Sequence, residues 1–272
     1  MKIYCQKILL SIGLFIFTTQ IFASSGKNNN STILVDNPAN EITQANNPLA
    51  NLKAFNLQNY FYPTISGFNT TGDTAWLRYA QPIDKFLIRA SLPIQTFPVS
   101  QNGARQTGTG DFNIFAVYTF DTGNSNVSAG IGPLLVAPTA SPTLLGAGKW
   151  QGGLAGVYYN ASSKVFQYGG LVTYQADFAG QQNRQHTSIL TAQPFAFYQL
   201  GKGLYLRSAP IWTFNFYNNT GVIPLSLGVG KIVKVNKTVY NFFIEPQFAV
   251  YHHGLGQPTS QIYAGLNMQF YG

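Results

Sequence analysis

The final strand-length segment of the chain shows a side-chain period of two. Its apolar residues alternate with small or polar ones: Ile262, Ala264, Leu266, Met268 and Phe270 against Gly265, Asn267 and Gln269. Successive side chains of a β-strand point to opposite faces, so the pattern predicts a strand with one apolar and one polar face. The pattern recurs along most of the chain in segments of about ten residues, which is typical of a transmembrane β-barrel.

Twelve segments carry this pattern, with boundaries accurate to a few residues. They span residues 55–66, 73–83, 85–97, 109–121, 126–138, 149–160, 164–178, 187–199, 203–217, 221–234, 238–252 and 260–271. In the third segment, Phe86, Ile88 and Ala90 share one face while Arg89 and Ser91 share the other. We therefore expect an all-β fold, an antiparallel up-and-down transmembrane barrel of about 12 strands.

The predicted connections alternate in length. Short turns are expected near residues 82–84, 122–124, 162–163, 201–202 and 236–237, and mostly longer loops at 66–72, 100–108, 139–148, 180–186, 218–220 and 253–259. Outer-membrane barrels have short periplasmic turns and long outer loops, and an even strand number places both termini in the periplasm. A soluble β-sandwich is the competing fold. The sustained alternation, the scarcity of charge on one face and the aromatic last strand favour the barrel.

Residues 1–23 have the features of a signal peptide. Lys2 and Lys7 precede a ten-residue apolar run at 8–17, and small residues follow at 23–25. An uncleaved anchor is the alternative, but the run is too short to span a bilayer comfortably. Cys5 is the single cysteine and lies in this leader, so the mature chain should lack disulfides and thiol nucleophiles. We expect cleavage of the leader and localisation in the outer membrane of a Gram-negative bacterium.

The segment that follows the leader, residues 24–52, is rich in Asn, Ser, Ala and Thr and shows no sustained periodicity. This composition predicts a disordered periplasmic segment. Residues 53–272 then form the barrel domain.

Composition supports a membrane barrel over a soluble domain. Charged residues make up 9% of the chain, against about 25% in soluble domains. Aromatic residues reach 15%, which agrees with girdles at two membrane interfaces. The net charge of +8 is scattered without a Lys/Arg cluster or binding motif, so nucleic acid is not expected as a partner. The expected partners are outer-membrane lipid, the barrel-insertion machinery and a small-molecule solute.

Several short motifs occur in a characteristic order. They are Gly108-Thr109-Gly110-Asp111, Gly148-Lys149-Trp150, Phe178-Ala179-Gly180 with Arg184, Gln193-Pro194-Phe195 with Tyr198, Gly203-Leu204-Tyr205-Leu206 and the segment 223–231. Together they resemble the outer-membrane family associated with the phenol meta-cleavage degradation pathway, whose bacterial members are often labelled neuromedin U. The resemblance covers about residues 75–272. It implies a membrane barrel that admits small, often aromatic, compounds, and it identifies no substrate-site residues.

The chain departs from that family in two places. Gly203-Leu204 stands where members often have a Gly-Trp pair, and the last strand ends in Phe270-Tyr271-Gly272 without a terminal Phe. The second departure makes recognition by the barrel-insertion machinery atypical.

Charged residues on the predicted inner faces are the main candidates for function. They are Arg78, Arg89, Asp111, Asp177, Arg207 and Glu245. Such charges can form a constriction that selects solutes, as charged rings do in pores. Alternatively they are paired ions that fill a narrow barrel, because charges shut away from water must be paired. Arg184 lies in an outer loop, where we expect it to pair with Asp177 and fix the loop; a solvated arginine is the alternative.

Catalysis and metal binding have little support in the sequence. His186 and Ser188 lie near a strand end, but no Gly-x-Ser-x-Gly elbow is present, so a barrel hydrolase is a minor alternative. His252 and His253 are adjacent and would face opposite sides of a strand, so no metal site is predicted. No enzyme activity and no cofactor are expected. The sequence predicts passive uptake of small solutes, and hydrophobic or aromatic compounds are the expected class. A structural or surface protein without transport is the alternative.

Overall fold

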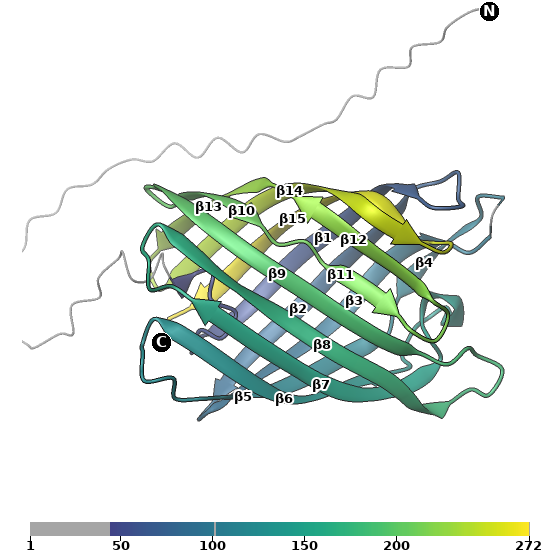
Figure 1. Ribbon diagram of the computed structural model, residues 1–272, viewed down its shortest axis with the longest axis horizontal. Helices are drawn as coiled ribbons and strands as arrows, with labels where there is room; N and C mark the ends of the chain where they lie inside the picture. Colours follow the sequence, from purple (N-terminus) through teal and green to yellow (C-terminus); the bar gives the residue numbers. More distant parts are fainter. Residues whose placement is uncertain (1–43, 101, 272) are drawn as a thin grey trace, which may run out of the picture. The chain divides into compact units, whose positions relative to one another are not determined.

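The computed structural model describes residues 44–100 and 102–271, which form a closed antiparallel barrel of twelve strands (Figure 1). The predicted all-β, up-and-down fold is confirmed. The predicted signal peptide, residues 1–23, and residues 24–43 of the next segment lie outside the described residues. No helix in the described ranges is long and apolar enough to cross a membrane.

Each of the twelve predicted segments overlaps a strand of the barrel. The labelled strands are β1 (Lys53–Ile65), β2 (Gly72–Ile83), β3 (Phe86–Pro98), β4 (Arg105–Thr109), β5 (Phe112–Thr119), β6 (Val127–Ala137), β7 (Lys149–Asn160), β8 (Phe166–Gly180), β9 (Ser188–Gly201), β10 (Leu204–Ser208), β11 (Trp212–Asn215), β12 (Thr220–Ser226), β13 (Gly228–Val235), β14 (Thr238–His253) and β15 (Pro258–Phe270). Three barrel strands are interrupted and carry two labels each: β4 with β5, β10 with β11, and β12 with β13.

The barrel closes because the first strand pairs with the last. Antiparallel pairing of β1 with β15 places Tyr60 opposite Tyr263, and β14 pairs with the other edge of β15. The remaining pairs join strands that follow each other along the chain. Closure satisfies the backbone hydrogen bonds of every edge, which a sheet surrounded by hydrocarbon requires. This closed meander distinguishes the fold from a two-sheet sandwich.

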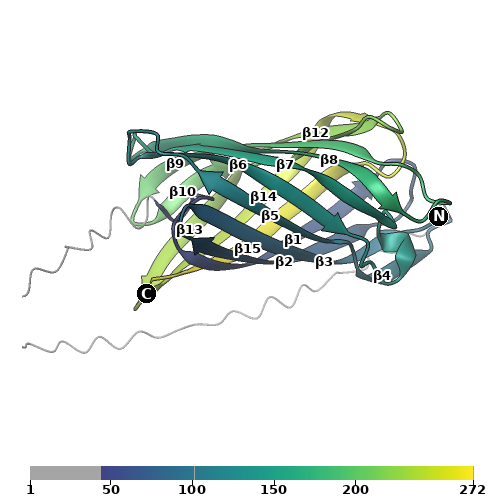
Figure 2. The same cartoon turned by 90° about the horizontal axis from the view of Figure 1, so that it is seen from below.

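The connections divide the barrel into two ends, seen at opposite sides of Figures 1 and 2. The short-turn end has the connections 84–85, 120–126, 161–165, 202–203 and 236–237, together with the C terminus. The long-loop end has the connections 66–71, 99–104, 138–148, 181–187, 216–219 and 254–257. The predicted alternation of lengths is present in part, because the loops 216–219 and 254–257 are shorter than the turn 120–126.

The outer surface is apolar and carries exposed aromatic side chains near both ends. Near the short-turn end these include Phe86, Tyr118, Phe120, Tyr158, Phe166, Tyr168 and Tyr198; near the long-loop end they include Trp150, Tyr174, Phe178, Phe216 and Tyr251. Neighbouring rings contact each other, as Phe86 and Tyr118 do at 5.3 Å between centroids. An apolar band between two aromatic girdles matches the exterior of a membrane barrel.

The inner face differs between the two ends. In the short-turn half it is filled by buried apolar side chains, among them Leu87, Phe115, Val117, Tyr159, Phe195, Phe197, Tyr205 and Val239. Buried polar side chains lie among them, including Gln167, Asn241 and Gln269. The predicted polar inner face is therefore present only in part in this half, because apolar side chains occupy many of its inward positions.

Residues 44–52, predicted as part of the disordered segment, lie inside the barrel at the short-turn end. We call residues 44–50 the plug. Ala45 and Leu49 belong to the apolar cluster of the inner face. Asn47 donates to Ser128 Oγ at 3.1 Å, and Asn241 donates to Asn46 Oδ1 at 2.9 Å. The surfaces that hold the plug come from β6 and β14, far along the chain, so local composition did not reveal it.

Candidate functional site in the barrel lumen

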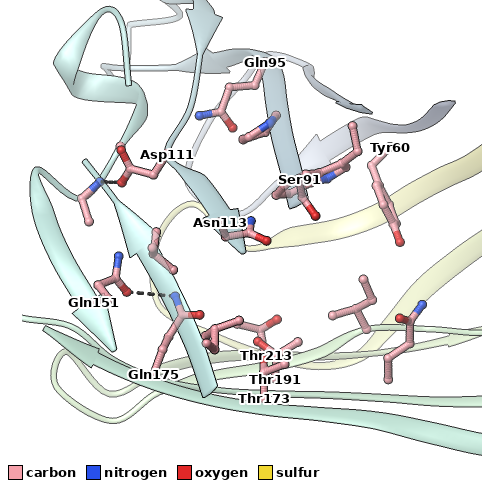
Figure 3. A pocket seen from close by; sticks show the side chains of 18 of the residues that line it. Tyr60, Ser91, Gln95, Asp111, Asn113, Gln151, Thr173, Gln175, Thr191 and Thr213 are labelled. Carbon is pink, nitrogen blue, oxygen red and sulfur yellow. Dashed lines mark hydrogen bonds between the residues drawn. The ribbon is translucent and has the colours of Figure 1, made fainter. Parts of the chain in front are cut away.

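A cavity of about 650 Å³ occupies the long-loop half of the lumen. Figure 3 shows its polar lining converging from many strands: Tyr60 of β1, Ser91 and Gln95 of β3, Asn113 of β5, Gln151 of β7, Thr173 and Gln175 of β8, Thr191 of β9 and Thr213 of β11. Most of these groups are amides and hydroxyls; Gln175, for example, donates to Gln151 Oε1 at 2.9 Å. Because such uncharged groups both donate and accept hydrogen bonds, the cavity can solvate a polar molecule.

Two of the predicted residues, Arg78 and Arg89, lie at the inner limit of this cavity. They also line a second cavity of about 140 Å³, as do Leu171 and Gln193. The guanidinium of Arg78 stacks on Trp76 at 4.6 Å from the ring centroid and donates to Gln58 Oε1. That of Arg89 stacks on Phe115 at 4.3 Å. The two cavities therefore meet at a level that carries two positive charges.

The second cavity lies against the plug. Its lining includes Ala45, Asn46 and Asn47 of the plug together with Arg207. A solute that passed through the barrel would cross the larger cavity, the level of the two arginines and this smaller cavity. Beyond it, the plug and the apolar side chains fill the short-turn end.

Arg207 and Glu245 form a buried ion pair in the lumen. Arg207 Nε lies 2.5 Å from Glu245 Oε2, and the Glu245 side chain is fully buried. Glu245 also accepts hydrogen bonds from the backbone N–H of Ala209 at 2.8 Å and from Gln247 Nε2 at 2.9 Å. The Ala209 N–H is free for this bond because the barrel strand is interrupted between β10 and β11. The guanidinium also lies 3.6 Å from the centroid of the Phe243 ring. This geometry matches the paired-ion interpretation for these two residues.

Asp111 fixes the loop 138–148 at the mouth of the larger cavity. It sits in the gap between β4 and β5 and accepts the backbone N–H groups of Ala147, at 2.7 Å, and Ala140, at 3.2 Å. Gln95 donates to the carbonyl of Leu145 in the same loop. Gly108 permits the close approach, since a Cβ there would overlap the carbonyl oxygen of Ser141. Leu144 and Leu145 of this loop line the cavity.

Arg184 holds the same loop, and its predicted pairing with Asp177 is wrong. Its guanidinium donates to the carbonyls of Gly146, of Ala147 at 3.3 Å and of Thr143 at 3.1 Å. Asp177 instead bonds His186 Nδ1 at 2.7 Å and the Thr187 N–H at 2.6 Å, and lies 3.9 Å from Lys149 Nζ. The strand positions explain the different partners. Asp177 lies in β8, near the start of the loop 181–187, and its side chain points toward Lys149 of β7.

The proposed hydrolytic pair is not assembled. Ser188 Oγ lies 3.1 Å from Tyr174 Oη, and the His186 ring is bonded to Asp177. Within the described ranges, no group of three His, Cys, Asp or Glu side chains is placed to hold a metal ion. His252 and His253 are exposed at the end of β14.

We expect the substitution Arg184→Gln to loosen the loop 138–148. Loss of charge-assisted bonds to three carbonyls, partly exposed to water, should lower the local opening free energy by about 1–2 kcal/mol. Hydrogen–deuterium exchange of peptides covering residues 140–148 should become faster while exchange in β7 stays unchanged. Arg105→Gln is the matched control, because Arg105 is an exposed arginine at the same end that bonds the Thr71 hydroxyl. Equal exchange in the two variants would contradict the role of Arg184.

Sequence reasoning missed three features of this site. It did not identify the plug, the Trp76 and Phe115 rings under the two arginines, or the role of Gln95 in holding the loop. The contact of Trp76 with Arg78 could have been predicted, because a spacing of two residues places both side chains on the inner face of β2. The other contacts join segments that are distant in sequence.

Solved structures of outer-membrane channels have the same fold. The COG4313 outer membrane channel from Pseudomonas putida F1 matches with a TM-score of 0.58 and 14% identity, covering 80% of this chain and 95% of that one. The NanC porin matches with a TM-score of 0.53 and 9% identity, covering 80% of this chain and 100% of that one. No family model matches the sequence, and no curated protein matches it. At these identities the likeness establishes a shared barrel architecture.

Proposed function

We propose that this protein is a passive channel for small solutes in the outer membrane of a Gram-negative bacterium. The observation that carries the proposal is a closed barrel with an apolar exterior around a polar cavity of about 650 Å³. The exterior fits hydrocarbon and the aromatic girdles fit two interfaces, so outer-membrane lipid is the proposed surrounding. The match to solved outer-membrane channels supports the same placement.

The solute and the assembly route belong to the proposal as well. Uptake of aromatic compounds rests on the family resemblance, and the rings of Trp76 and Phe115 near the cavity agree with it. Cleavage after the leader and recognition of the last strand by the barrel-insertion machinery are further parts of the proposal.

A structural protein without transport is the second candidate, and the plug favours it. In that case the filled short-turn end stays closed under all conditions. Planar bilayer recordings of the purified protein discriminate the two. A channel should give discrete current steps in potassium chloride, and liposomes that contain it should swell in isotonic solutions of a permeant sugar. Absence of both, in the full chain and in a variant without the plug, would overturn the channel proposal.

A further inference from the structure

Three buried polar atoms without hydrogen-bond partners lie on one patch of the lumen wall. They are Arg78 Nε, Arg89 Nε and Ser91 Oγ. All three residues line the larger cavity, and Ser91 is only 2% exposed. The pairing of β2 with β3 places Arg78 opposite Ser91, two residues from Arg89. Diagonal neighbours at this spacing lie about 7–8 Å apart along the backbone, so the three residues belong to one patch of the wall.

Ring stacking holds both guanidiniums in place. Arg78 lies over Trp76 and Arg89 over Phe115. Stacking on a ring face fixes the plane of a guanidinium but leaves its edge available for hydrogen bonds. Because the two planes are already fixed, little side-chain entropy would be lost when a ligand binds.

The positive charge on this patch is not neutralised by a protein carboxylate. Neither arginine takes part in an ion pair within the described part of the chain, whereas Arg207 is paired with Glu245. Asp111 is the acidic residue among those lining the larger cavity, and its oxygens accept N–H groups of the loop 138–148. Uncompensated charge that is partly shut from water is costly, so a bound anion would relieve that cost.

We propose that Arg78, Arg89 and Ser91 form a binding site for the carboxylate of a small organic acid. The planar guanidinium edge matches a carboxylate, which can accept two parallel hydrogen bonds. The same cavity is lined by Leu134, Val136 and Leu171, which suit a short apolar body attached to the carboxylate. The inference rests on the proposed function, because it names the class of solute that the channel would take.

Trp76 supplies a direct readout of binding. The chain has three tryptophans, so a Trp150→Phe/Trp212→Phe background leaves Trp76 alone, stacked on Arg78. Titration of this protein in detergent with hexanoate should give a saturable change in fluorescence. Hexanamide, which has the same length without the charge, should give none. An equal response to the two compounds would overturn the proposal, and so would tighter binding of inorganic phosphate than of hexanoate.

Substitutions test the assigned residues. Arg89→Gln should weaken hexanoate binding roughly tenfold, as expected for loss of a charge-assisted hydrogen bond. Arg105→Gln removes the same charge at the long-loop end and should leave the affinity unchanged. An unchanged affinity in Arg89→Gln would overturn the proposal.

Ser91→Ala separates binding from folding. The Ser91 hydroxyl has no partner in the protein, so its removal should leave the unfolding transition in urea unchanged and weaken hexanoate severalfold. A role in stability alone would give the opposite pair of results and would overturn the assignment of Ser91. The measurement is independent of ion flow: hexanoate binding without conductance would refute only the channel, and conductance without hexanoate binding would refute only this site.

Discussion

Removal of the plug, residues 44–50, is expected to raise the single-channel conductance severalfold. Ala45 and Leu49 pack into the apolar cluster at the short-turn end, and Asn47 is bonded to Ser128. Without these residues the smaller cavity, which the plug lines, opens toward the short-turn end. Planar bilayer recordings of the full chain and of the deletion variant measure the difference. Equal conductance would show that the apolar side chains of the barrel close the path by themselves.

Two point substitutions test whether the plug closes the barrel without changing the length of the chain. Leu49→Asp places a charge at a position that is 7% exposed, which costs several kcal/mol and favours release of the plug. Ala50→Asp adds the same charge one residue later, where the side chain is half-buried and borders the smaller cavity. We expect raised conductance in the first variant and little change in the second. Similar currents in both would point to charge in the lumen, rather than plug release, as the cause.

Breaking the buried ion pair is expected to have the largest effect on stability. Arg207→Met leaves the Glu245 carboxylate fully buried without its cation, and removal of one partner of such a pair costs about 3–5 kcal/mol. The contacts of the guanidinium with the rings of Phe243 and Tyr263 are lost as well. Urea unfolding of the protein in lipid vesicles should show the loss as a lower transition midpoint.

The double variant Arg207→Met/Glu245→Gln is the control for that prediction. A neutral amide still accepts the Ala209 N–H, and no unpaired charge remains. Most of the lost unfolding free energy should therefore return, since replacing both members of a buried pair is often close to neutral. Additive losses in the double variant would show that the two side chains do not act as a pair.

The strands were predictable because their signal is local. A strand with one face toward lipid repeats its polarity every two residues, and this requires no knowledge of its neighbours. The outward residues of β15, from Ile262 to Phe270, illustrate this. The sequence did not predict the strand interruptions at Gly110, Pro210 and Leu227. Each lies inside a predicted segment, and the strand continues beyond it.

The site was predictable only in part. Alternation indicated that Arg78, Arg89, Arg207 and Glu245 share the inner face, but it gave no partners. The register of the paired strands determines the partner of each side chain. Arg78 lies opposite Ser91 in the β2–β3 pair, and Arg207 reaches Glu245 across β13. The pairing predicted for Arg184 failed for the same reason, since its acceptors are carbonyls of another loop.

The sequence by itself determined the strands, their number and their outward faces, because each of these depends on residues close together in the chain. Only the tertiary structure decided which half of the lumen is polar, which charges are paired, and that residues 44–50 fill the short-turn end. Those features depend on side chains from different strands, which come together only when the strands pair in register and the barrel closes. The contacts that stabilise these features join residues distant in sequence, so the pattern of neighbouring residues does not predict them.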